Sequence, residues 1–181
     1  MALWGISDAD ESKPKWLTDA DKKKVYADAS GWRFENPKSG ATDEILCAVS
    51  GLAVSIGSAD ITEIEFISTA FDKSEGGTLS VRVRFNEAVA VTGTPQLTVV
   101  NDQRANHVLS YASGTGSNEL VFSLVIGAAN AATNAGDVLS IGANAMALNS
   151  GTVKDNGTST NATITNIAGI GTAAGTITVA A

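Results

Sequence analysis

The chain has 181 residues, and 12 Lys and Arg against 19 Asp and Glu give it a formal net charge of −7 at pH 7. This acidic balance disfavours nucleic-acid binding, which needs a basic surface to neutralise phosphates. One Cys excludes an intramolecular disulfide and a Cys-rich zinc site, and one His excludes a multi-His metal centre, so we expect a structural or binding protein with no catalytic, cofactor or metal site.

Residues 1–30 are predicted to form an extended arm rich in Ser, Asp and Lys. Thr18 and the acids after it can cap a short helix over residues 22–27, which would be marginal by itself. The apolar residues of this region are spaced singly and give no periodic core face. The start of the chain has no signal-peptide pattern, and no stretch of about 18 apolar residues occurs, so we expect no membrane contact.

All three tryptophans lie in the first 32 residues. A few buried aromatic side chains supply most of the energy of a typical interface. We therefore predict that the N-terminal region docks on a partner through a small set of apolar anchors, namely Leu3, Trp4, Trp16, Leu17 and Trp32. The alternative, given equal weight, is that these tryptophans pack on the chain's own domain.

Residues 31–60 are predicted to be a β-hairpin region. Residues 31–35 form one candidate strand, residues 36–40 carry the turn signal Asn-Pro-Lys-Ser-Gly, and residues 44–49 form the return strand. Cys47 lies in this apolar return strand, where a free cysteine behaves as a small buried hydrophobe.

Residues 61–167 carry the pattern of a β-sandwich. The segment 79–85 alternates strictly between apolar and polar residues, which is typical of a half-buried antiparallel strand. About seven short strands with turn signals roughly every ten residues favour a sandwich. The predicted strands cover 61–67, 79–85, 97–100, 107–111, 120–126, 138–141 and 162–167. Residues 168–181 are predicted to be a loosely ordered tail, with an edge strand over 176–179 as the alternative.

Three segments in this region resemble the bacterial immunoglobulin-like repeats of large surface adhesins. They are residues 85–99 (FNEAVAVTGTPQLTV), 111–122 (YASGTGSNELVF) and 148–155 (LNSGTVKD), in the same order and at compatible spacing. This resemblance implies an all-β chain whose main domain is an immunoglobulin-like β-sandwich. Such modules serve as spacers, adhesins and capsid ornaments, so the fold does not fix the function.

A second resemblance covers residues 1–57. Residues 1–5 (MALWG), 13–17 (KPKWL), Gly31-Trp32 and 44–48 (EILCA) are similar to the N-terminal region of virion structural proteins of tailed bacteriophages, notably marine ones. Cys47 stands where that pattern has Val.

Together the two resemblances imply a virion structural protein with an exposed immunoglobulin-like domain. We expect a capsid decoration, or cement, protein on the capsid exterior, made in the host cytoplasm. Its partners would be the major capsid protein or other virion proteins, in many copies or as a homo-oligomer, with at most weak contact to host-surface glycans. The alternatives are a neck, tail or fibre component of the virion, and a cell-surface or carbohydrate-binding adhesin module.

The residues whose side chains could take part in catalysis or metal binding are expected to have structural roles. His107 has no nucleophile pattern beside it and is expected at the surface or at a strand end. Five acids at predicted loop positions could contribute to calcium binding, but solvated surface charge is the expected role; they are Asp72, Glu75, Glu87, Asp137 and Asp155.

Overall fold

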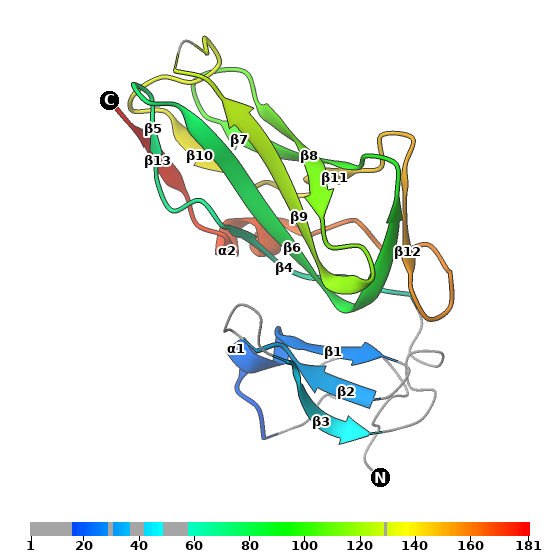
Figure 1. Ribbon diagram of the computed structural model, residues 1–181. Coiled ribbons are helices and arrows are strands. Elements are labelled where there is room, and N and C mark those ends of the chain that lie inside the picture. The colour runs from blue at the N-terminus through cyan, green and yellow to red at the C-terminus, as the bar shows by residue number, and fades with distance from the viewer. Residues whose placement is uncertain (1–15, 29–30, 37–41, 49–57, 129) are drawn as a thin grey trace.

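The structure is a computed structural model that describes residues 16–28, 31–36, 42–48, 58–128 and 130–181. It is an all-β protein with two short helices (Figure 1). The elements in chain order are α1 (Asp19–Lys22), β1 (Val25–Asp28), β2 (Gly31–Phe34), β3 (Glu44–Ala48), β4 (Ile61–Phe66), β5 (Phe71–Asp72), β6 (Gly77–Thr92), β7 (Gln96–Asn101), β8 (His107–Ser113), β9 (Ser117–Ile126), β10 (Val138–Ser140), β11 (Met146–Ala147), β12 (Thr152–Asp155), α2 (Ala168–Ala173) and β13 (Ile177–Ala180).

The strands divide into two parts that meet at β6. The first, called the N-terminal unit, comprises the described residues 16–48 and is the small antiparallel sheet β1-β2-β3. The second, called the β-body, comprises the described residues from 58 onward, in the pairing order β6-β9-β8-β7-β10-β13-β5, with β4 and β12 also on β6. Figure 1 shows the N-terminal unit below the long strands of the β-body.

The strand β6 organises the β-body. The side chains of its alternating residues Leu79, Val81, Val83 and Phe85 are completely buried, as the sequence pattern predicts. They face apolar residues of β9, of which Leu120, Phe122 and Ile126 are buried and Leu124 is partly buried. One continuous core results, because every strand from β4 to β13 contributes a buried or partly buried apolar residue to it.

A register shift in β6 separates the part of the strand that pairs mainly with β4 and β9 from the part that pairs with β12. Its first half pairs with β4 and β9, and the pairing with β9 is interrupted between the pairs Arg84–Glu119 and Val89–Ser117. Its last four residues pair with β12. At the shift between Arg84 and Val89, Ala27 of β1 pairs with Glu87 in parallel, so the N-terminal unit joins the β-body at this bend.

The region predicted as an arm differs from the expectation where it is described. Thr18 does cap a helix, accepting a hydrogen bond from the Asp21 amide, but this helix is only Asp19–Lys22. The prediction of a helix over 22–27 is wrong, because Val25 and the residues after it form β1 and pair with β2. Burial of Val25 against Trp32 outweighs the weak helix signal.

The C-terminal third brings two further corrections. Residues 162–167 form no strand and make one isolated bridge, from Thr163 to Asp60, and β12 is the strand in this part of the chain. Asn166 explains the irregular path, because its side chain bonds the Ala145 amide and the Gly142 carbonyl. Residues 168–181 are not a loosely ordered tail, because they form α2 and β13. The strand β13 buries Ile177 and Val179 and pairs with β10 and β5. Its position is close to the alternative prediction of an edge strand over 176–179.

The alternation in β6 and β9 predicts unequal effects for two identical substitutions. Val83→Ala should lower the free energy of unfolding by about 2 kcal/mol, because Val83 is completely buried and a cavity would remain. Val125→Ala removes the same atoms from a side chain that is 77% exposed and should change stability by less than about 0.5 kcal/mol. Urea unfolding of both variants measures the difference, and equal losses would contradict the assigned faces.

Candidate docking unit and its charged attachment

The N-terminal unit has a very small core of its own. Val25 and Trp32 are the two buried residues of its apolar cluster, at 1% and 0% exposure. Half-buried apolar side chains surround them, namely Leu17, Phe34, Leu46 and Cys47. Cys47, predicted to be a small buried hydrophobe, is therefore half-buried and packs against this cluster. A three-stranded sheet with so little buried surface needs further contacts to be stable.

The five predicted docking residues have different places in the structure. Trp32 is completely buried, so its role as a docking side chain is corrected: it fills the core of the N-terminal unit. Leu17 is half-buried against that core. Trp16, which directly precedes Leu17, is 66% exposed. Leu3 and Trp4 lie outside the described residues.

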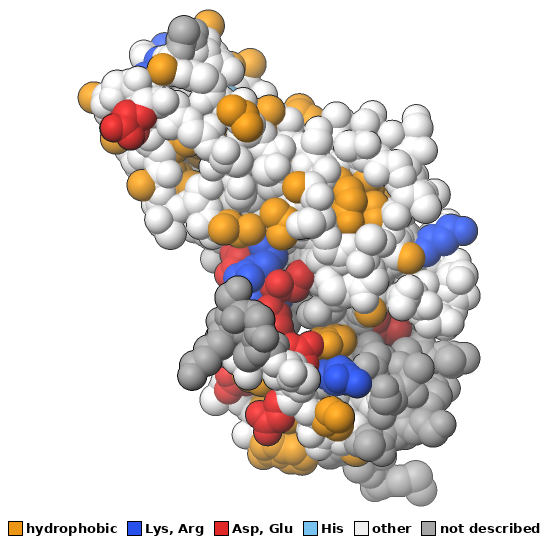
Figure 2. All heavy atoms as spheres, viewed as in Figure 1, with side chains coloured by type: hydrophobic (Ala, Val, Ile, Leu, Met, Phe, Trp, Pro, Cys, Tyr) orange, Lys and Arg blue, Asp and Glu red, His pale blue; other side chains and the backbone are white. Residues whose placement is uncertain are grey.

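The N-terminal unit has a second large exposed apolar side chain besides Trp16. Ile45 on β3 is 57% exposed, opposite Arg33 of β2. Figure 2 shows apolar and acidic side chains next to one another on the surface of this part of the molecule. The N-terminal unit therefore turns one tryptophan inward and another outward.

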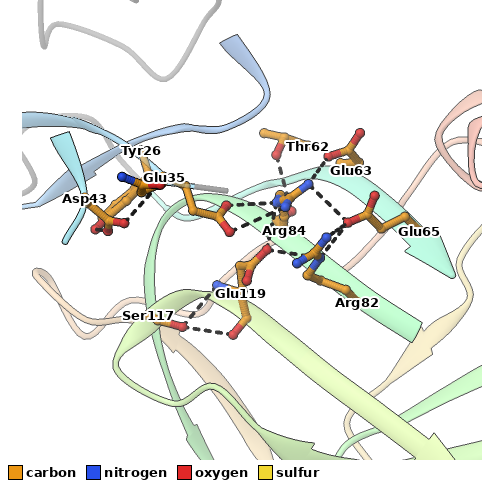
Figure 3. Close-up of polar contacts among 11 residues, drawn as sticks. Tyr26, Glu35, Asp43, Thr62, Glu63, Glu65, Arg82, Arg84, Ser117 and Glu119 are labelled. Carbon is orange, nitrogen blue, oxygen red and sulfur yellow. Dashed lines mark hydrogen bonds and ion pairs between the residues drawn. The ribbon is translucent and has the colours of Figure 1, made fainter. Parts of the chain in front are cut away.

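The N-terminal unit is attached to the β-body by ionic contacts that the sequence analysis did not anticipate (Figure 3). Arg84 on β6 is at the centre, with a side chain only 6% exposed. Its guanidinium lies 3.0 Å from Glu35, which directly follows β2, and 2.6 Å from Glu63 on β4. We call the full set the charged cluster: Glu35, Glu63, Glu65, Arg82, Arg84 and Glu119.

The two arginines of the charged cluster share their carboxylates. Arg82 pairs with Glu65 and with Glu119, and Arg84 contacts the same two glutamates at 3.3 Å and 2.8 Å. Burial alone disfavours the charge on Arg84, but the hydrogen bond to Glu63 and the charge of Glu35 outweigh it and raise the pKa of the guanidinium. Arg84 therefore remains a buried cation held by carboxylates from three parts of the chain.

Glu119 is the least satisfied member of the charged cluster. Its Oε1 atom is buried and lies within ion-pair distance of both arginines, but it accepts no hydrogen bond. Burial raises the pKa of the Glu119 carboxyl to about 7, and contact with the Glu35 carboxyl adds to the rise, while Arg82 and Arg84 oppose it. Near neutral pH, this carboxyl is therefore close to its titration midpoint.

Part of the charged cluster could have been found from sequence. Glu63 and Glu65 alternate with apolar residues on β4, as Arg82 and Arg84 do on β6, so each pair lies on the outer face of its strand. An antiparallel pairing of the two strands would have matched opposite charges. Glu35 could not be placed in this way, because it is 49 residues from Arg84 in sequence and arrives from another sheet.

His107 is the first residue of β8, in agreement with a strand end, but it is buried at 3% exposure and not at the surface. Its Nε2 lies 3.0 Å from the Thr133 hydroxyl. Burial lowers the pKa of His107, and the charge of Asp137 opposes this shift only in part. The imidazole is therefore a neutral structural group near pH 7.

The acids considered for calcium binding are separated in the structure. The expected role as solvated surface charge is wrong for three of them, because Glu87 on β6, Asp137 and Asp155 are buried. Asp72 accepts hydrogen bonds from Ser74, and Asp155 accepts from the amides of Gly157 and Thr158. Asp137 accepts from Asn101 and from the Asn134 amide. In the part of the chain that the structure describes, no group of three or more His, Cys, Asp or Glu side chains could hold a metal ion.

A hollow of about 160 Å³ lies beside the charged cluster. Lys23 and the β4 residues Thr62 and Glu63 line one side, and residues of α2 and its cap line the other, among them Ile167 and Ile170. The volume is below the ≈ 300–1,000 Å³ of small-molecule sites and suits a single apolar side chain.

Comparisons of the chain with protein-family models, with curated proteins and with solved structures give no significant match. Within the described ranges, neither helix has the length and apolar character needed to cross a membrane.

Because Arg84 is buried, we expect removal of its charge to lower the stability of the protein strongly. Arg84→Met leaves several carboxylates together without their central cation and should lower the free energy of unfolding by about 3 kcal/mol. Arg104→Met is the matched control, since Arg104 is 40% exposed and pairs with Asp137 at 3.3 Å; its loss should be below about 1 kcal/mol. Denaturant unfolding measures both, and similar small losses would contradict a structural role of the charged cluster.

The buried imidazole predicts a stability change on the acid side of neutrality. The folded-state pKa of His107 is lowered, so the unfolded state binds the proton first, and stability is lost as pH falls through about 6.5. Unfolding free energies of the wild type and His107→Gln, measured from pH 7.5 to 5.5, should therefore diverge, with the wild type losing more. Parallel curves would show that the imidazole accepts its proton in the folded state without cost.

Proposed function

We propose that this chain is a virion structural protein of a tailed bacteriophage, a capsid decoration protein that docks by its N-terminal unit and displays the β-body as an immunoglobulin-like sandwich. The observation that carries the proposal is the exposed Trp16 on a unit whose described residues include two buried apolar side chains, Val25 and Trp32. Trp is among the residues most enriched at interface hot spots.

The size of the N-terminal unit supports docking. Its own apolar cluster is small, and it presents Trp16 and Ile45 to solvent. Covering these two side chains with a partner would add apolar burial to a unit that has little of it, at roughly 25 cal/mol per Å². The unit is thus suited to a role in which a second protein, such as the major capsid protein, completes its packing.

The β-body has the surface expected of a displayed module. Beyond the charged cluster, the outward positions of neighbouring strands carry small hydroxyl side chains, such as Ser80, Ser123 and Ser110, which lie opposite one another in register. After Glu119 the sequence contains only three charged residues, Asp137, Lys154 and Asp155. The resemblance of residues 85–99 to adhesin repeats adds the immunoglobulin-like topology to this proposal.

In this function the chain acts mechanically and performs no reaction. Each copy would bury its N-terminal anchors against the capsid exterior, and many modest contacts repeated over the shell would resist internal DNA pressure. A neck, tail or fibre component remains the second candidate, and quantitative mass spectrometry of purified particles separates the two: many copies support decoration, and a small ring of copies supports the neck or tail. A sugar-binding adhesin is less well supported, because residues 61–181 contain no Trp to stack on a sugar.

The proposal predicts that binding to particles depends on Trp16. Particles assembled without this chain are incubated with the purified chain and sedimented, and the bound protein is quantified. Trp16→Ala should weaken binding at least about 30-fold, as expected for a loss of about 2 kcal/mol at an interface anchor. Val125→Ala, which changes an exposed apolar side chain of the β-body, is the control and should bind normally.

Two results would overturn the proposal. One is the absence of binding by the wild-type chain to particles that lack it. The other is unchanged binding of Trp16→Ala together with weakened binding of Val125→Ala, which would move the docking surface to the β-body. Circular dichroism and thermal unfolding of both variants show that each is folded before the binding assay.

A further inference from the structure

Within the described residues, several contacts connect the N-terminal unit and the β-body across the seam between them. One is the parallel pair Ala27–Glu87 between β1 and β6. Another is Glu35, whose carboxylate bonds Arg84 through Nε at 3.0 Å and Nη2 at 3.5 Å. Glu35 and Arg84 therefore link the two parts directly (Figure 3).

At this seam, two carboxylates from opposite sides meet at one atom. Arg84 Nε lies 3.0 Å from Glu35 and 2.8 Å from Glu119, which is on β9. Two carboxyl groups that both lie within 3.0 Å of one nitrogen atom are close to each other and repel when both are ionised. A single proton on the pair removes this repulsion and lets one carboxyl donate a hydrogen bond to the other.

The surrounding charges do not cancel this repulsion. The charged cluster contains four glutamates and two arginines, so with every group ionised it carries a net charge of −2. Glu63 and Glu65 reach it from β4, and Arg82 and Arg84 from β6. Lys23, which follows α1, lines the hollow that Glu63 also lines. One bound proton brings the cluster closer to neutrality.

We propose that Glu35 and Glu119 form a proton-operated latch between the N-terminal unit and the β-body. With one proton on the pair, the latch is closed and the N-terminal unit is held on β6. When the proton leaves, the two carboxylates repel each other, the Glu35 contact weakens, and the N-terminal unit separates more easily from the β-body. The latch does not depend on the proposed function as a virion protein.

The direction of the pH response follows from linkage. The pKa of Glu119 is raised in the closed form to about 7 from its ordinary value of 4.5, so the closed form binds the proton more tightly than an open form in which Glu119 is solvated. The closed form is then favoured in acid and loses this advantage as pH rises through about 7. A difference of this size changes the opening equilibrium by at most about 300-fold.

Distance measurements on the full-length chain test the latch. In a Cys47→Ala background, Ile45→Cys on β3 and Ser110→Cys on β8 provide two exposed positions for spin labels, one in each part. Double electron–electron resonance at pH 5.5 should give one narrow distance distribution. At pH 8.5 we expect a second, broader component whose population is at least tenfold higher than at pH 5.5. Identical distributions at both pH values would overturn the latch.

Two variants assign the response to the carboxyl pair. Glu119→Gln keeps the shape of the side chain but is always neutral, so its distance distribution should remain narrow at both pH values. Glu75→Gln is the control, because Glu75 is an exposed carboxylate on the turn after β5, and it should respond to pH as the wild type does. A full pH response in Glu119→Gln would overturn the proposal.

A measurement without variants provides a second test. Carbon-13 NMR of the glutamate carboxyl groups in the unmodified chain should show Glu119 titrating near pH 7. If the Glu119 carboxyl titrates below pH 5, it holds no proton near neutral pH and the latch is overturned.

Discussion

The structure depends on how the buried cation Arg84 is compensated. A guanidinium with only 6% exposure has lost most of its water, and the cost of that loss is offset only if carboxylates surround it. Those carboxylates come from β4, from β9 and from the segment after β2, so a single buried charge fixes the positions of three parts of the chain. In this way the N-terminal unit, which has little core of its own, obtains a defined place on the β-body.

The strand that carries Arg84 also builds the core. On one face of β6, completely buried apolar side chains run from Leu79 to Phe85, and on the other face lie Arg82 and Arg84. Beyond the register shift after Arg84, β6 keeps the pair Val89–Ser117 with β9, while its last four residues pair with β12 and Glu87 pairs with Ala27 of β1. Core packing and the attachment of the N-terminal unit are thus mechanically linked through one strand.

The contrast between Trp16 and Trp32 bears on the proposed docking. Both lie in the N-terminal unit, yet one is 66% exposed and the other is completely buried. Trp32 stabilises the unit from within, and Trp16 offers an apolar surface that a partner can cover. If the Glu35–Glu119 pair releases the unit when it loses its proton, the orientation of Trp16 relative to the β-body would change with pH. The proposed docking through Trp16 would then also depend on pH.

Local patterns in the sequence determined the all-β class and the buried face of β6, because period-two alternation depends only on neighbouring residues. They also determined the approximate positions of β2, β3, β4, β7, β8 and β9. The tertiary structure decided what depends on contacts between distant segments. Val25 belongs to a strand because β2 and Trp32 are beside it, and residues 162–167 are irregular because Asn166 bonds the segment around Ala145. The charged cluster arose in the same way: Glu35 and Arg84 are 49 residues apart, and only the fold brings them within 3.0 Å.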